Sequence, residues 1–163
     1  MNSAKALIPS ASRSNGIFRF SINSVSSLTA VIVSLSKPKP GPITTPVDFS
    51  KKTRLDDVVE HIEKMCAGGT DCALPMLNAI QTKTKVDTFV ILTDNETYLG
   101  SVHPAQALLQ YRDKVNPGAK LVVLAMTATE FSIADPSDSG MLDVVGLDSS
   151  VPSIIRDFSV GMA

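Results

Sequence analysis

Two unbroken apolar runs, each as long as a typical strand, dominate the hydrophobic pattern of this chain. Residues 89–92 read Phe-Val-Ile-Leu within Val86–Thr93, and residues 121–126 read Leu-Val-Val-Leu-Ala-Met within Lys120–Met126. A short run that is apolar at every position and bounded by polar residues is typical of a strand buried on both faces of a parallel sheet. Weaker apolar runs at 28–35 and 141–147 predict two further strands.

Apolar residues at helical spacing lie between and after these runs. Residues 53–66 carry one apolar stripe: Leu55, Val58, Val59, Ile62, Met65 and Cys66. That stripe predicts an amphipathic helix, and shorter helices are expected around Pro75–Gln81, from Pro104 to Val115, and from Ser150 onward. Alternating strands and helices predict an α/β fold with a mostly parallel sheet and helices on both faces.

The remaining segments are expected to be loops or weak strands. Gly68–Asp71 forms a loop whose glycines either turn the chain or let the backbone approach a partner closely. Short strands are conceivable at 17–22 and 43–45. The polar stretch 128–140 contains the aspartates Asp135 and Asp138. Metal binding by these aspartates is one interpretation, and turn formation is favoured because Asp-Pro and Ser-Asp-Ser-Gly are turn sequences.

Composition indicates one folded domain outside a membrane. The chain has 163 residues, of which 44% are hydrophobic, which is enough for one core. No apolar run approaches the ~20 residues that a membrane helix needs, so no membrane partner is expected. Cys66 and Cys72 match neither a disulfide framework nor zinc spacing. They are expected to be buried thiols of a reducing, cytoplasmic protein.

Charge is distributed unevenly along the chain. All 16 acidic residues lie at or after Asp48, whereas five of the 15 basic residues precede it, so the first 47 residues carry +5 and the remaining 116 carry −6. The acidic main body lacks the clustered Lys and Arg of a nucleic-acid surface. Residues 1–27 are Ser-rich and free of acid, as in a transit peptide or an unstructured leader. We favour an unstructured leader or a start borrowed from outside the parent domain, and we expect a poorly ordered segment at 1–27 that does not belong to the domain at 28–163.

Polar side chains follow the central strand directly, beginning with Asp94. Ligands of open α/β sheets bind outside the carboxyl ends of the strands, so this position is a candidate site, with a helix cap or Asx-turn as the alternative. Thr70 lies in a loop expected at the same edge. A hydroxyl and a carboxylate suit Mg²⁺ or Mn²⁺. Two ligands leave the coordination of such a cation incomplete.

Three segments carry a resemblance to a known family: AGGTDCALPM, FVILTDNETYLGSVHPAQALLQYR and FSIADPSDSGMLDVVGLD. They closely resemble the C-terminal von Willebrand factor A domain of the Ro (SS-A) ribonucleoprotein family, RNA-binding proteins built on the TROVE module. The resemblance runs from about Leu28 to the C-terminus. It implies a six-stranded, largely parallel sheet and a metal-ion-dependent adhesion site made by a D-x-S-x-S loop, a threonine and an aspartate. Thr70 matches that threonine and Asp94 that aspartate.

The first loop of this family site has no secure match. No aspartate precedes Asp48, so D-x-S-x-S cannot occur before the strand at 28–35. Ser24 and Ser26 have the right spacing and could act as weak replacements, but Ile22 stands where the aspartate should be. The connection from Ile22 to the next strand is too short for a parallel crossover, which takes about a dozen residues. A strand at 17–22 would therefore form an antiparallel hairpin with 28–35.

The domain is therefore expected to lack the family's first strand and helix. Because that strand lies in the middle of the family's sheet, we expect a gap between 28–35 and 86–93. Each unpaired buried backbone group costs ~1–3 kcal/mol, against a total stability of ~5–15 kcal/mol. Either residues 1–27 fill the gap, or the chain is a marginal fragment, such as a truncated and non-functional isoform.

The favoured function is a non-catalytic binding module of a Ro-like RNA-binding ribonucleoprotein, with an incomplete site that binds metal weakly or not at all. The resemblance implies small non-coding RNA and an acidic group of a partner as ligands, although the family's RNA-binding ring has no counterpart here. The enzyme alternative is a metal-assisted hydrolase using Asp94 and Glu96, which would need a base and a dry pocket. His103 is the nearest histidine, and its His-Pro context is typical of a structural role.

Overall fold

A computed structural model describes residues 71–93, 100–126, 132–146 and 148–162, isolated residues within 53–64, and the backbone alone at 28–31, 35–36 and 69–70. The leader 1–27 and the weak strands expected at 17–22 and 43–45 fall outside these residues.

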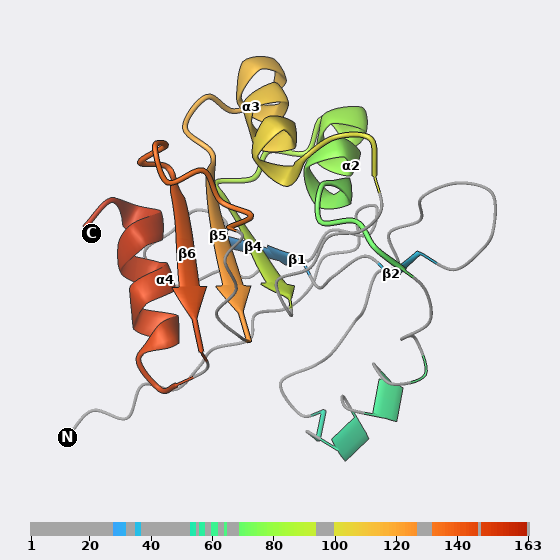
Figure 1. The fold of residues 1–163 in the computed structure, drawn as a ribbon, viewed down its shortest axis with the longest axis vertical. Coiled ribbons are helices and arrows are strands. Elements are labelled where there is room, and N and C mark those ends of the chain that lie inside the picture. The colour runs from blue at the N-terminus through green and yellow to red at the C-terminus, as the bar shows by residue number, and fades with distance from the viewer. Residues whose placement is uncertain are drawn as a thin grey trace.

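A four-stranded parallel sheet forms the centre of the described structure (Figure 1). Its strands lie in the order β1 (Leu28–Val31), β4 (Thr88–Thr93), β5 (Lys120–Ala125) and β6 (Met141–Val145), and every neighbouring pair is parallel. The two strands predicted from unbroken apolar runs, β4 and β5, occupy the middle. Five of the six residues in each are buried, as expected for strands covered on both faces. The predicted parallel α/β sheet is confirmed.

The predicted gap beside β4 is wrong. β1 lies directly alongside β4, with Leu28 opposite Thr88 and Val31 opposite Ile91. Strand β4 therefore has a parallel neighbour on each side, and the ladders pair the backbone groups that a gap would have left unsatisfied. The stability cost expected from an empty position does not apply to this sheet.

A second sheet contains only two residues from each strand. β2 (Leu35–Ser36) pairs antiparallel with β3 (Gly69–Thr70). The sequence predicted one strand over 28–35 and a loop over 68–71, and both predictions are wrong in this detail. β1 ends at Val31, Leu35 belongs to the second sheet, and the glycine-containing residues 69–70 form strand bonds. A two-residue pairing between distant segments leaves no periodic pattern that the sequence could reveal.

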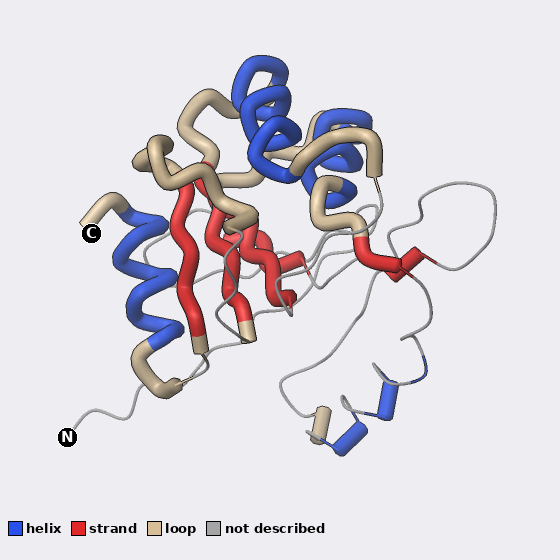
Figure 2. Tube along the Cα trace, viewed as in Figure 1, coloured by secondary structure: helices blue, strands red, loops and turns tan. Residues whose placement is uncertain are grey.

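Helices cover both faces of the main sheet (Figure 2). Helices α2 (Leu74–Thr82) and α3 (Pro104–Lys114) pack on one face, and α4 (Val151–Val160) packs on the other. All three were predicted, with ends that differ by a few residues. In the segment predicted as a helix over 53–66, the described helical residues are exposed, namely Asp56, Asp57, Glu60, His61 and Lys64. They belong to the polar face of the predicted amphipathic helix and not to its apolar stripe.

The alternating side chains of β4 and β5 build two cores. Phe89, Ile91, Leu121 and Val123 pack with α2 and α3, whereas Val90 and Val122 pack with Phe158 of α4. Lys120 anchors α4 from the sheet: its Nζ donates a 2.6 Å hydrogen bond to the carbonyl of Phe158 and lies 5.0 Å from the centre of that ring. A cation near the last carbonyls of a helix also interacts favourably with the helix dipole, and a cation near an aromatic ring interacts favourably with its π face.

None of the described helices is both long and apolar enough to cross a membrane.

Candidate functional site

The structure places the predicted metal ligands only in part. Thr70 is the last residue of β3, where the backbone alone is described. Asp94 follows Thr93, the last residue of β4, and lies outside the described residues together with Glu96. The serines proposed as weak replacements, Ser24 and Ser26, also lie outside them. The metal site of Thr70 and Asp94, with Ser24 and Ser26 as weak replacements, therefore stays a prediction.

The residue after Thr70 is a buried carboxylate. Asp71 is only 6% exposed, and its Oδ1 accepts a 2.9 Å hydrogen bond from the backbone N–H of Ala73 at the start of α2. Burial away from water raises the pKa of Asp71 above its ordinary value, and the hydrogen bond from Ala73 offsets part of that rise. Asp71 is not among the candidate site residues predicted from the sequence. The sequence feature that could have pointed to Asp71 is its position at a turn, directly before the apolar residues Cys72 and Ala73 that lead into a helix.

Gly100 packs directly against this carboxylate. A Cβ built on Gly100 would lie 2.6 Å from Oδ2 and 2.8 Å from Oδ1 of Asp71, and the φ angle of Gly100 is +119°. Space and backbone conformation both require glycine here. Gly100 is the first described residue after the segment that contains Asp94. The contact therefore brings together Gly100 and Asp71, the residue that follows Thr70.

The end of β4 is held within the sheet. Thr93 is 5% exposed, and its carbonyl accepts a 3.0 Å hydrogen bond from the N–H of Met126. On the next strand, the carbonyl of Ala125 accepts a 2.9 Å hydrogen bond from the N–H of Gly146. These bonds define the carboxyl edge of three neighbouring strands, the edge at which open α/β sheets bind ligands.

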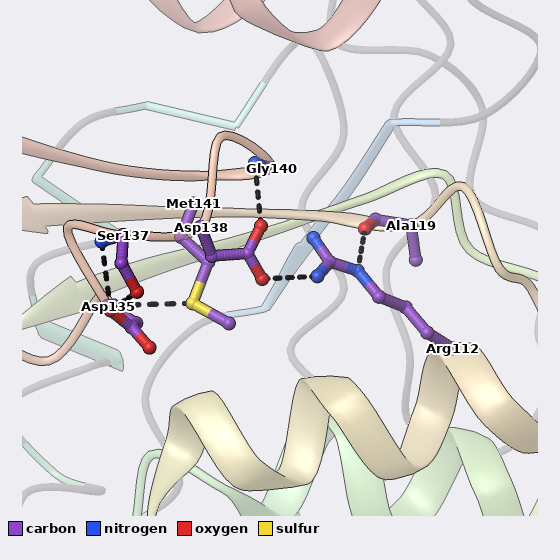
Figure 3. Close-up of polar contacts among 7 residues, drawn as sticks. All are labelled: Arg112, Ala119, Asp135, Ser137, Asp138, Gly140 and Met141. Atoms are coloured by element: carbon purple, nitrogen blue, oxygen red, sulfur yellow. Dashed lines mark hydrogen bonds and ion pairs between the residues drawn. The ribbon is translucent and has the colours of Figure 1, made fainter.

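Asp135 and Asp138 form turns, as the favoured interpretation predicted (Figure 3). Asp135 Oδ1 accepts hydrogen bonds from the N–H and the hydroxyl of Ser137, at 2.9 and 2.6 Å. Asp138 Oδ1 accepts from the N–H of Gly140 at 2.8 Å, and its other oxygen pairs with Arg112. These bonds lower the pKa of both carboxyl groups. The largest cause is the hydrogen bond from the Ser137 hydroxyl for Asp135 and the hydrogen bond from Arg112 for Asp138.

These two aspartates also lie at the wrong edge for the candidate site. They precede β6, so they lie at the amino edge of the parallel sheet, opposite the end of β4. Within the described residues, no group of three His, Cys, Asp or Glu side chains could hold a metal ion. The metal interpretation of Asp135 and Asp138 gains no support.

His103 has the structural role that its context predicted. It is the N-cap of α3, and its Nδ1 accepts a 3.3 Å hydrogen bond from the N–H of Ala105. Such a bond satisfies one of the N–H groups that a helix start leaves without a partner. The predicted burial of the cysteines is confirmed for Cys72, which is 2% exposed, and Cys66 lies outside the described residues.

The oxygen ligands predicted at the carboxyl edge suit a hard cation in kind but not in number. Thr70 and Asp94 would offer a hydroxyl and a carboxylate, which are oxygen ligands of the type that Mg²⁺ and Mn²⁺ prefer. The buried Asp71 directly follows Thr70 in the sequence. Six-fold coordination would still need water, further side chains or a partner's carboxylate.

An open parallel sheet with helices on both faces and a candidate cation site at its carboxyl edge defines a domain of the von Willebrand A class. Within that class, the sequence profile of the Ro60 vWA domain matches residues 19–159. The chain belongs to this Ro60 von Willebrand A family. The resemblance found in the sequence is thereby confirmed.

Two curated relatives and one solved structure share this similarity. The chain is 47% identical over 116 residues to the RNA-binding protein RO60 of Deinococcus radiodurans, covering 71% of this chain and 22% of that protein. It is 43% identical over 118 residues to the RNA-binding protein RO60 of Caenorhabditis elegans, covering 72% and 18%. The crystal structure of the Deinococcus radiodurans RO (RSR) protein matches with a TM-score of 0.53 and 54% identity, over 59% of this chain and 19% of that chain. The chain spans about a fifth of the length of these relatives.

Proposed function

We propose that this chain is a non-catalytic binding module, the von Willebrand A part of a Ro-like RNA-binding ribonucleoprotein, with an incomplete metal-ion-dependent adhesion site. The observation that carries the proposal is the family match over residues 19–159, which includes both Thr70 and Asp94. The fold supports it because β4 ends at Thr93, so Asp94 follows directly at the edge where such sheets bind ligands. An acidic group of a partner would complete the cation's coordination.

The incomplete site predicts weak metal binding. A ligand that binds only the folded state stabilises it by RT ln(1 + [L]/Kd), about 2.7 kcal/mol when the ligand is at 100 Kd. We expect Mg²⁺ or Mn²⁺ to leave the melting temperature unchanged at micromolar concentration and to raise it slightly, if at all, at millimolar concentration. Any rise should disappear in Asp94→Ala. A strong rise at micromolar Mg²⁺ would contradict the incomplete site and indicate a full set of ligands.

We further propose that RNA is a partner of the whole ribonucleoprotein and that this domain does not contact RNA through its own surface. Residues 48–163 carry a net charge of −6, which opposes contact with phosphates. A gel shift with short structured RNA at physiological salt is expected to show no complex with this chain. A complex that persists at physiological salt would contradict this part of the proposal, whereas a complex that is lost at physiological salt is non-specific.

A cytoplasmic location of the protein stays a prediction.

A further inference from the structure

We propose that Asp143 keeps β6, the outer strand of the main sheet, from pairing with β6 of a second copy of this chain. Within the described residues, β6 has a strand neighbour on one side only, which is β5 (Figure 1). An open strand edge presents backbone groups that another chain can bind, and proteins block such edges with charged side chains on the core-facing side. The inference goes beyond the proposed function and uses none of the predicted metal ligands.

Alternate residues of β6 direct their backbone groups to opposite sides of the strand. The carbonyl of Gly140 accepts a 2.9 Å hydrogen bond from the N–H of Leu121 on β5. The N–H of Gly146 donates a 2.9 Å hydrogen bond to the carbonyl of Ala125 at the other end of β5. The even-numbered residues of β6 therefore bond to β5, and the odd-numbered residues direct their N–H and C=O groups outward. The outward positions are Met141, Asp143 and Val145.

A second copy of β6 would have to bind at the centre and the end of this strand. The N–H of Met141 already donates a 2.9 Å hydrogen bond to the carbonyl of Asp138, which leaves Asp143 and Val145. Two copies related by a twofold axis pair these strands antiparallel. A pairing centred on Asp143 places two carboxylates directly opposite each other, which is destabilising. A pairing of Asp143 with Val145 covers each carboxylate with an apolar side chain, which removes water from a charge.

Contacts on the core-facing side hold the carboxylate of Asp143 in place. Asp143 shares its face of β6 with Met141, whose side chain belongs to the main core. The hydroxyl of Ser132 donates a hydrogen bond to Asp143 Oδ2, and the neighbouring Ile133 and Ala134 are buried in the same core. Burial raises the pKa of Asp143 above its ordinary value, and a hydrogen bond from the backbone of Ala134 offsets part of that rise. The carboxylate has thus already lost part of its water, and a second strand would remove more.

The rest of β6 is apolar, so the strand depends on one charge. Leu142 and Val144 are half-buried and pack with the core beneath α4, and Val145 is 56% exposed. With valine at position 143 the strand would read Met-Leu-Val-Val-Val. A short uncharged strand of β-branched residues at an open edge is the kind that pairs with other chains.

The test measures the mass of the full chain by sedimentation at neutral pH, from micromolar to submillimolar concentration. Wild type is expected to be monomeric throughout. Asp143→Val is expected to shift the average mass toward twice that of the monomer as concentration rises. Asp143→Asn removes the charge but keeps the shape, and should show the same shift at higher concentration. The matched control is Asp113→Val, the same substitution at an exposed position of α3, which should stay monomeric.

A second substitution separates strand pairing from aggregation of a damaged fold. The N–H of Val145 points away from β5, so proline at this position removes an outward donor and leaves the bonds to β5 in place. Adding Val145→Pro to Asp143→Val is therefore expected to restore the monomer. Association that persists in this double variant would overturn the proposal, because it would not depend on the outer edge of β6.

The remaining outcomes also decide the question. A wild-type chain that dimerises would overturn the proposal, and so would equal association of Asp113→Val and Asp143→Val. Circular dichroism establishes that each variant is folded, and a folded Asp143→Val that stays monomeric would likewise overturn it. If Asp143→Val does not fold, Asp143→Asn decides, with association expected and monomeric behaviour at every concentration contradicting the role of the charge.

Discussion

Replacing Arg112 by Ala is expected to lower the free energy of unfolding by about 2–3 kcal/mol, somewhat below the cost of breaking a fully buried pair. Arg112 joins α3 to the amino edge of the sheet (Figure 3). Its Nε donates a 2.7 Å hydrogen bond to the carbonyl of Ala119, and its guanidinium pairs with Asp138, the two side chains being 17% and 20% exposed. The truncation leaves both acceptors without their donor. Urea unfolding followed by circular dichroism measures the loss.

The matched control is an exposed ion pair on α4. Arg156 pairs with Asp157, and these side chains are 46% and 38% exposed. Arg156→Ala should therefore change stability by less than about 1 kcal/mol. Equal losses in Arg112→Ala and Arg156→Ala would show that the partial burial of the first pair contributes nothing.

The same pair predicts how stability depends on pH. The hydrogen bond from Arg112 is the main reason that the pKa of Asp138 lies below its ordinary value. A carboxyl group with a lowered folded-state pKa contributes its full stability above its unfolded pKa of about 3.9 and loses it as the pH falls through the folded-state value. The stability difference between wild type and Asp138→Asn should therefore be largest near neutral pH and shrink below about pH 4. A difference that stays constant from pH 7 to pH 3 would contradict the assignment.

The parts of the fold that could be predicted are those that a local pattern encodes. The unbroken apolar run of β4 and the helical stripe of α3 each bury their own neighbours in sequence, so periodicity finds them. Strand pairing depends on which distant segment lies alongside, and the pattern of 28–35 does not contain that information. The apolar run at Leu28 could be predicted as a strand, but its position directly beside β4 could not.

The candidate site shows the same division. Asp94 could be singled out because it follows a predicted buried strand, and Thr70 because its loop was expected at the same edge and a resemblance gave it a role. Asp71 could not be predicted because Gly100, which it contacts, lies in the connection between β4 and α3, and no local sequence pattern near either residue indicates the contact. Asp138 could be predicted to form a turn from Ser-Asp-Ser-Gly, whereas its pairing with Arg112 spans 26 residues of sequence. Local chemistry was predictable, and contacts across the fold were not.

Replacing Tyr111 by Phe is expected to lower the free energy of unfolding by about 2 kcal/mol, the cost of leaving a buried donor unpaired. The hydroxyl of Tyr111 accepts a 2.7 Å hydrogen bond from the N–H of Val86 and donates a 2.8 Å hydrogen bond to the carbonyl of Thr84. Tyr111 and Val86 are both fully buried. The hydroxyl thereby fixes the connection from α2 to β4. Thermal or urea unfolding measures the effect.

Phenylalanine isolates the hydroxyl because it keeps the ring. The Tyr111 ring meets the Phe89 ring edge to face, at 4.9 Å between centroids and 89° between planes, and Phe at position 111 retains that contact. Ser137→Ala removes an exposed hydroxyl and should cost less than about 0.5 kcal/mol. A loss for Tyr111→Phe as small as that of the control would mean that the segment relaxes and pairs the N–H of Val86 elsewhere. A loss near 2 kcal/mol would mean that the hydroxyl of Tyr111 stabilises the connection that leads from α2 into β4.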